Sequence, residues 1–292
     1  MKRSKKFFTR FIQSILRNLF FKSLYPSYLF FKTKRKFKKI INKNKDFKKY
    51  SNNLDKINDY EYKLTSQNNE DGIIEHVFKI IPNNKYFIEI GFGYYEFNSL
   101  NLIKNNWSGK LIDIDQDEVI ALKKNLDFFF PKNSVEIINA KITKDNITSI
   151  LSDNKNKVID FFSLDIDSND YWILKEIDLS NISLLCCEYN HWLGKDKKLT
   201  IRYNENFKFE DNGIWGMSLL AIDDLLSKKN FSLIAVESSG TNAFFINNKF
   251  KSKFEILSPL KSYRSVGRFY NLEKKQEIFE NVRKNYNELI EL

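Results

Sequence analysis

The chain has 292 residues, of which 42% are hydrophobic and 15% aromatic, which is enough apolar content for a folded core and excludes global disorder. Its only cysteines, Cys186 and Cys187, are adjacent in an apolar run, so we expect no useful disulfide. With only two histidines besides, a zinc site is not expected either. This cysteine content fits a protein of the reducing cytoplasm. The net charge of +11 arises in residues 1–50, which hold 17 Lys/Arg and one acid; the rest is net acidic, so a broad basic surface for nucleic acid is not expected.

Residues 1–60 are interpreted as a basic, aromatic-rich N-terminal extension. Its apolar segment 7–31 is interrupted by three cations and Pro26, so no uncharged run is long enough to span a bilayer, and the small residues of a cleavable signal are missing. Large apolar side chains recur at helical spacing beside the cations. This pattern predicts a helix in the plane of an anionic membrane, with residues 1–50 placing the protein on the inner face of the membrane. The alternative is a helix packed on its own domain.

Residues 61–292 are expected to form one domain in which buried strands alternate with helices. Short continuous apolar runs predict parallel strands, and two later runs joined by a Ser-Gly turn predict an antiparallel hairpin at one edge. We expect strands at 86–90, 110–114, 135–139, 158–166, 182–189, 231–238 and 241–247, and helices at 73–81, 98–105, 117–127, 170–177, 218–229 and 271–290. Asp115 and Asn169 are the expected N-caps of two helices. The predicted fold class is α/β, with a Rossmann-like, doubly wound, mostly parallel sheet.

The first two strands end in glycines and acids, at the edge where open parallel sheets bind ligands. The first ends in Glu89-Ile90-Gly91-Phe92-Gly93, where glycines let the backbone pass close to a ligand. The second ends in Asp113, an acid that can accept both hydroxyls of a ribose. A nicotinamide-binding loop would need a third glycine where this chain has Glu96, an anion that would repel pyrophosphate. S-adenosylmethionine has a cationic sulfonium and no phosphate, so it suits these acids better.

An ordered set of short motifs runs from residue 66 to residue 247. It comprises SQNNEDGII (66–74), the EIGFG loop with EFNS (96–99), Asp113, FFSLDIDSNDYWIL (161–174), CCEYN (186–190) and TNAFFI (241–246). Together these resemble class I S-adenosylmethionine-dependent methyltransferases, and more particularly the FkbM-like family. That family's D-x-G-A-N-x-G loop and I-D-x-E-G motif occur here with altered residues, at 89–95 and 166–169, and this departure bears on the substrate more than on the cofactor.

The resemblance implies S-adenosylmethionine as cofactor and a sugar, glycan or glycolipid hydroxyl as the group that is methylated. The strand-end loops would hold the cofactor from its methionine end, through the ribose, to the adenine, and the acid after the fourth strand would face both cofactor and acceptor. In chain order the implied cofactor contacts are Glu89, Gly91, Phe92, Gly93, Asp113, Ile114, Ala140, Lys141 and Asp165.

The acids after the fourth strand allow three interpretations. A calcium loop fits badly, because its sixth position is Asp170 where glycine is needed. The Asp165-x-Asp167 spacing is also how many glycosyltransferases hold a divalent metal on a sugar nucleotide, so a metal-dependent glycosyltransferase is the alternative function. In the third interpretation, which we favour, Asp165 accepts a proton or contacts the cofactor, Asp170 caps the next helix, and no metal is bound.

Candidates for the base that takes the acceptor's proton are Asp165, Glu188 and His191, all at the ligand-binding edge. An adaptor acting through residues 1–50 is a third, noncatalytic class of function. No pattern indicates the oligomeric state. Expected acceptor contacts are Asp167, Tyr189, Asn190 and Tyr203, with Trp215 and Asn242 as further members of the pocket.

Overall fold

The computed structural model describes residues 25–46, 55–93, 95–154, 157–265 and 270–292. Its centre is a seven-stranded sheet in the order β3-β2-β1-β4-β5-β8-β7. Neighbouring strands from β3 to β5 run parallel, and β8 pairs antiparallel with β5 and β7, so the predicted doubly wound sheet with an antiparallel hairpin is confirmed. The strands are β1 (Tyr86–Ile90), β2 (Ser108–Asp113), β3 (Val135–Asn139), β4 (Ile159–Leu164), β5 (Ile182–Glu188), β7 (Phe231–Val236) and β8 (Asn242–Asn247).

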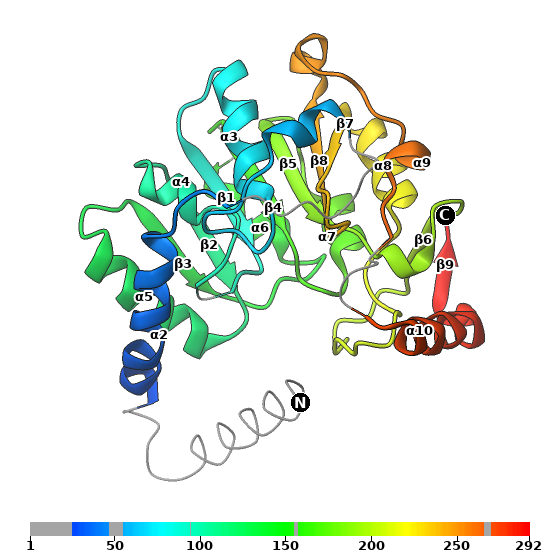
Figure 1. Ribbon diagram of the computed structural model, residues 1–292, viewed down its shortest axis with the longest axis horizontal. Helices are drawn as coiled ribbons and strands as arrows, with labels where there is room; N and C mark the ends of the chain where they lie inside the picture. Colours follow the sequence, from blue (N-terminus) through cyan, green and yellow to red (C-terminus); the bar gives the residue numbers. More distant parts are fainter. Residues whose placement is uncertain (1–24, 47–54, 94, 155–156, 266–269) are drawn as a thin grey trace.

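Helices cover both faces of this sheet (Figure 1). Side chains of successive strand residues fill the two interfaces alternately: Phe87 and Phe161 face one layer, and Ile88 and Phe162 the other. Because both faces are buried, these strands appear in the sequence as continuous apolar runs. The first layer contains α3 (Glu70–Ile80), α4 (Leu100–Lys104) and α5 (Gln116–Phe129), and the second α6 (Ile147–Ile150), α7 (Asp170–Glu176) and α8 (Leu219–Lys228).

A two-stranded sheet of β6 (Leu199–Ile201) and β9 (Leu289–Glu291) lies to one side of the main sheet (Figure 1). It has an apolar cluster of its own, to which α10 (Leu272–Lys284) also contributes. The helix predicted for 271–290 therefore ends early, and the last residues pair as a strand. Three-residue strands show no periodicity in a sequence, so the long-range pairing alone decides this. The short remaining elements are η1 (Lys56–Tyr60), η2 (Ser152–Asn154), η3 (His191–Leu193), η4 (Asn248–Lys253), α9 (Pro259–Ser262) and η5 (Tyr286–Glu288).

The two predicted helix caps have different outcomes. Asp115 caps α5, because its carboxylate accepts the N–H groups of Asp117 and Glu118 at 2.9 and 3.1 Å. Asn169 stands at the N-cap position of α7 but makes no capping hydrogen bond. Its amide instead donates to the Asn204 carbonyl and accepts the Asn204 N–H, so it connects α7 to a distant loop.

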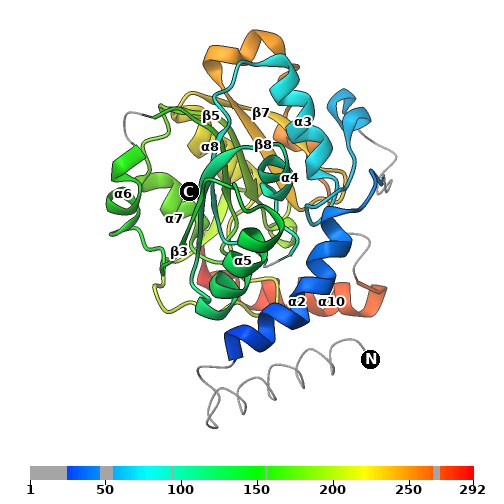
Figure 2. The same ribbon diagram turned by 90° about the vertical axis from the view of Figure 1, so that its left-hand side faces the viewer.

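The structure describes residues 25–46 and 55–60 of the N-terminal extension, and α2 (Tyr25–Ile41) packs along α5 in both views (Figure 1 and Figure 2). Asn125 donates to Thr33 at 2.9 Å, and Phe37 stacks on Phe129 with a centroid distance of 5.5 Å. Residues 25–41 thus form a helix packed on the domain, whereas most of the segment 7–31 lies outside the described residues, so both interpretations of that segment stay predictions. Among those residues no helix is long and apolar enough to cross a membrane.

The expected boundary at residue 60 lies within packed structure. Asn58 of η1 donates to the Val236 carbonyl at 3.0 Å, and Arg264 pairs with Asp55 at 2.8 Å. The segment before α3 is thus joined to the far end of the main sheet by buried polar contacts.

Candidate active site

A cavity of about 890 Å³ lies at the carboxyl ends of β1, β2 and β4. In the sheet, β2 lies on one side of β1 and β4 lies on the other. The loop after β1 therefore turns toward one side of the sheet and the loop after β4 toward the opposite side, which leaves a crevice between them. Its volume is in the range of small-molecule sites. All the predicted cofactor contacts line it: Glu89, Gly91, Phe92, Gly93, Asp113, Ile114, Ala140, Lys141 and Asp165.

Glu89 anchors the loop after β1. One carboxylate oxygen accepts the Asn98 N–H at 3.0 Å, and the other accepts the N–H of Ser99 at 2.8 Å together with its hydroxyl. Burial raises the pKa of Glu89 to about 7, although these hydrogen bonds act to lower it. Its oxygens therefore fix the shape of the cavity wall, and both charge states are populated near neutral pH.

Gly91 is the point where the loops after β1 and β4 touch. Its φ is +77°, and a Cβ at this position would overlap the Asp165 carbonyl oxygen. Backbone bonds hold the approach: Gly91 N–H donates to Ile112 O at 2.9 Å, and Asp165 N–H donates to Ile90 O at 3.0 Å. Glycine is required here for both reasons, its conformation and the space it leaves.

Asp113 joins the loops after β1 and β2. One oxygen accepts the Phe92 N–H at 3.1 Å and the other the Asp115 N–H at 2.7 Å, and burial raises the pKa of the carboxyl. Each oxygen retains a lone pair for a further donor in the cavity. The neighbouring Ile114 is 64% exposed although apolar, and with Ile142 it gives this end of the cavity an apolar lining.

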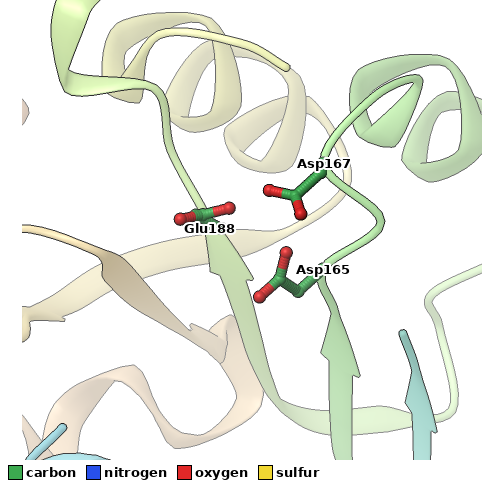
Figure 3. A group of neighbouring side chains, drawn as sticks. All are labelled: Asp165, Asp167 and Glu188. Atoms are coloured by element: carbon green, nitrogen blue, oxygen red, sulfur yellow. The ribbon is translucent and has the colours of Figure 1, made fainter. Parts of the chain in front are cut away.

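Three carboxylates converge beside the cavity (Figure 3). Asp165 and Asp167 belong to the loop after β4, Glu188 ends β5, and oxygens of the three groups lie within 4.8 Å of one another. Burial, followed by repulsion between the groups, raises the pKa of Asp165 and Glu188 well above ordinary values, and burial also raises that of Asp167. We call these three residues the acid cluster; it can hold shared protons or a divalent cation.

The sequence places Glu188 at the same edge of the sheet as the two aspartates, but it does not predict that the three carboxylates meet. The structure supplies three candidate ligands, and the expectation of no metal site stays a prediction. Sequence spacing suggested only the two aspartates, because the glutamate comes from the next strand.

Asp170 shapes the loop that presents the acid cluster. Its carboxylate accepts the N–H groups of Ile166 and Ser168, each at 2.9 Å, and burial raises its pKa to about 6. Asp167, within this turn, has a φ of +55°, a left-handed conformation that aspartate tolerates better than most residues. These two N–H groups lie before α7, so the prediction that Asp170 caps this helix is not confirmed.

Asn242 belongs to the cavity, as expected. It is the antiparallel partner of Glu188, so the two side chains share one face of the sheet. Its amide nitrogen donates to Glu70 at 2.9 Å, and its amide oxygen has no hydrogen-bond partner among the described residues.

Two predicted acceptor contacts support the fold instead of lining the cavity. Tyr189 follows Glu188 and points to the opposite face, where it is fully buried and its hydroxyl donates to the Arg264 carbonyl at 2.7 Å. The Asn190 amide donates to the carbonyls of Gly213 and Trp215 at 2.9 and 2.7 Å, which fixes the turn after β5. Neither side chain is among those that line the cavity.

His191 and Tyr203 are also absent from the cavity lining. His191 packs beside Trp192, with a centroid distance of 4.7 Å, and burial lowers its pKa to about 3. A buried imidazole with so low a pKa is a poor base, so the prediction for His191 is not supported. Tyr203 packs edge-on against Trp172, with the Lys144 ammonium 4.8 Å from its ring centroid.

Several lining residues were not indicated by the sequence. Lys32 and Lys36 come from α2, Glu118 from α5, and Phe207 and Phe209 from the loop between β6 and α8. None stands at a strand end. They reach the cavity through packing between segments far apart in the chain, which no local pattern reveals.

No protein-family model and no curated protein matches the chain. Similar solved structures include a S-adenosylmethionine-dependent methyltransferase from Clostridium acetobutylicum, with 11% identity, a TM-score of 0.41, and coverage of 61% of this chain and 89% of that one. The N-terminal domain of EvdMO1 with SAH bound has 8% identity and a TM-score of 0.42, over 74% of this chain and 94% of that one. A putative caffeoyl-CoA O-methyltransferase from Staphylococcus aureus has 14% identity and a TM-score of 0.41, over 60% and 81%. At these identities the likeness concerns the fold alone, and membership of the FkbM-like family stays a prediction.

Proposed function

We propose that this chain is an S-adenosylmethionine-dependent methyltransferase that methylates a hydroxyl of a sugar or glycan. The observation that supports this best is the cavity at the strand-order reversal, which acids from three strand ends, Glu89, Asp113 and Asp165, line together. A sulfonium carries positive charge and no phosphate. The acidic lining would therefore attract it, whereas it would repel the pyrophosphate of a dinucleotide.

The residues of the cavity suit the three parts of this cofactor. The backbone at Gly91 and Phe92 borders the space for the methionine end, Asp113 offers oxygens to the ribose hydroxyls, and Ile114 with Ile142 offers apolar contact to a flat base. The bound cofactor would supply an activated methyl group. The protein then has to align the acceptor oxygen and remove its proton.

We assign Asp165 as the base that accepts the proton of the acceptor hydroxyl. It lines the cavity, and Glu188 stands beside it in the acid cluster. Burial, followed by repulsion from neighbouring carboxylates, holds the pKa of Asp165 well above its usual range, which makes the ionised carboxylate a stronger base. The proton would pass from the acceptor hydroxyl to Asp165 and be shared with Glu188.

A hydroxylated acceptor suits the polar residues near the acid cluster. Asn98, Asn169 and Asn242 line the cavity there, and amides can both donate to and accept from hydroxyl groups. The resemblance to FkbM-like sequences supports the same class of acceptor.

Calorimetry with S-adenosylhomocysteine tests the cofactor assignment directly. We expect the full chain to bind it, and Asp113→Ala to bind about 10- to 100-fold more weakly, because two hydrogen bonds to the ribose are lost. Asp127→Ala is the matched control, since it removes an exposed acid of α5 and should bind as the wild type does. No binding by any of these proteins, or equal binding by Asp113→Ala, would contradict the assignment.

The acid cluster favours one second candidate, a metal-dependent glycosyltransferase. Its three carboxylates are a ligand set suited to a divalent cation on a sugar-nucleotide diphosphate. In that case a panel of uridine and guanosine diphosphate sugars should include one that binds only when Mn²⁺ is present, and Asp167→Asn should abolish the effect. If no sugar nucleotide in the panel binds, with or without Mn²⁺, this candidate is rejected.

A further inference from the structure

The outward side of α2 combines exposed aromatic residues with cations. Leu29, Thr33 and Phe37 face α5, whereas Tyr28 and Phe31 are exposed by 51% and 70%. At the neighbouring end of α5, Phe128 is 55% exposed and lies 6.3 Å, between ring centroids, from Phe30 of α2. The outward aromatic residues Tyr28, Phe31 and Phe128 are called the aromatic patch.

The same helix is strongly and uniformly charged. Its sequence contains six Lys/Arg residues and no acid. Within the described part of the chain, no ion pair joins any of them to a carboxylate. Arg35 and Lys38 are exposed, and the Lys34 ammonium lies 3.5 Å from the ring centroid of Phe128. Cations that form no ion pair with a described carboxylate, next to exposed rings, suit an anionic bilayer, because the cations can bind the lipid headgroups and the rings can enter the interface.

The helix also forms part of the cavity wall. Lys32 and Lys36 line the cavity, as does Glu118 of α5, and the Lys36 ammonium lies 4.8 Å from the ring centroid of Tyr95. A partner that holds α2 would therefore lie next to the cavity.

We propose that the outward side of α2, with the aromatic patch, rests on an anionic lipid bilayer and holds the cavity at the membrane boundary. Charge complementarity selects this partner, and the exposed rings favour a lipid interface over the backbone of a nucleic-acid duplex, whose phosphates bind cations and offer no apolar surface to the rings. The docking itself is independent of the methyltransferase assignment. Its consequence for the acceptor, that a lipid-linked glycan would come within reach of the cavity, rests on the proposed function.

Cosedimentation of the full chain with vesicles tests the proposal. We expect binding to vesicles of phosphatidylglycerol mixed with phosphatidylcholine and little binding to pure phosphatidylcholine. Arg35→Glu/Lys38→Glu should reduce the bound fraction roughly fivefold or more at low salt, because attraction to the surface becomes repulsion. Phe31→Ser/Phe128→Ser should reduce it similarly while leaving every charge in place.

The charge-matched control is Lys249→Glu/Lys251→Glu, in exposed positions of η4 at the opposite end of the molecule from α2 (Figure 1). It should sediment with the vesicles like the wild type, and S-adenosylhomocysteine binding should be equal in all variants. Three outcomes overturn the proposal: no binding of the wild type to anionic vesicles, equal binding of both α2 variants, or an equal loss in the η4 control. Retention on duplex DNA without vesicle binding would overturn it in favour of nucleic acid. Failure to bind S-adenosylhomocysteine would count against the proposed function and leave the vesicle result standing.

Discussion

Gly91→Ala is expected to lower the free energy of unfolding by more than about 3 kcal/mol and to abolish binding of S-adenosylhomocysteine. The added methyl group would overlap the Asp165 carbonyl oxygen and lie 2.7 Å from its carbonyl carbon, both of which are backbone atoms. The loops after β1 and β4 would have to separate, and they form the cavity. Urea unfolding measures the first effect and calorimetry the second.

Gly194→Ala separates the steric effect from the backbone effect. Gly194 also has a φ of +77°, but no described atom lies within 4 Å of a Cβ placed there. With ψ at −174°, the backbone of Gly194 lies in a region that glycine occupies almost exclusively, so the variant should lose about 1 to 3 kcal/mol from backbone strain alone and keep its ligand affinity. If Gly91→Ala unfolds at the same urea concentration as Gly194→Ala, the close contact with Asp165 does not constrain the fold.

Glu188→Gln is expected to stabilise the protein, and more so at pH 8 than at pH 5. The pKa values of Asp165, Asp167 and Glu188 are raised in the folded state, by burial first and then by repulsion involving Asp165 and Glu188. The folded protein thus holds protons that the unfolded chain has released, and stability is lost as pH rises through the folded pKa values. Each unit of pKa difference corresponds to about 1.4 kcal/mol. The variant removes one charge and adds an amide that can donate to the two aspartates.

The measurement is the difference between variant and wild-type unfolding free energies across this pH range. Other groups also titrate. Glu89 has a raised pKa of about 7, so its contribution to stability decreases as pH rises, whereas His191 has a lowered pKa of about 3, so its contribution increases. They are present in both proteins and cancel in the difference. Glu176→Gln, in an exposed position of α7, makes the same chemical change away from the acid cluster and should follow the wild-type curve. A difference for Glu188→Gln that stays constant or shrinks toward pH 8 would contradict repulsion within the cluster.

The cofactor side of the cavity was predictable because strand ends have fixed places. Glu89, Asp113 and Asp165 end or follow three buried apolar runs, and in a doubly wound sheet the carboxyl ends of such runs share one edge. An apolar run identifies a buried strand, and the carboxyl end of that strand gives the edge of the sheet at which the acid lies. These residues do line one cavity.

The acceptor side was less predictable because it depends on turns and cross-strand pairing. Glu188 and Tyr189 are adjacent in sequence, yet one joins the acid cluster and the other is buried on the opposite face. Asn190 was predicted to contact the acceptor in the same way, but its amide donates to two buried backbone carbonyls. Polarity alone does not distinguish a side chain that satisfies the backbone from one that faces a ligand.

Apolar periodicity is a local property of the chain, so the alternation of strands and helices, the doubly wound sheet and the acids at its ligand-binding edge could be predicted from the residues alone. Three features could not: the meeting of Glu188 with Asp165 and Asp167, the placement of Lys32 and Lys36 of α2 at the cavity, and the pairing of residues 289–291 as a strand. Those features depend on contacts between distant segments. Such contacts form only when the free energy gained by burying one segment against another exceeds the entropy cost of ordering both, and no local sequence pattern shows whether it does.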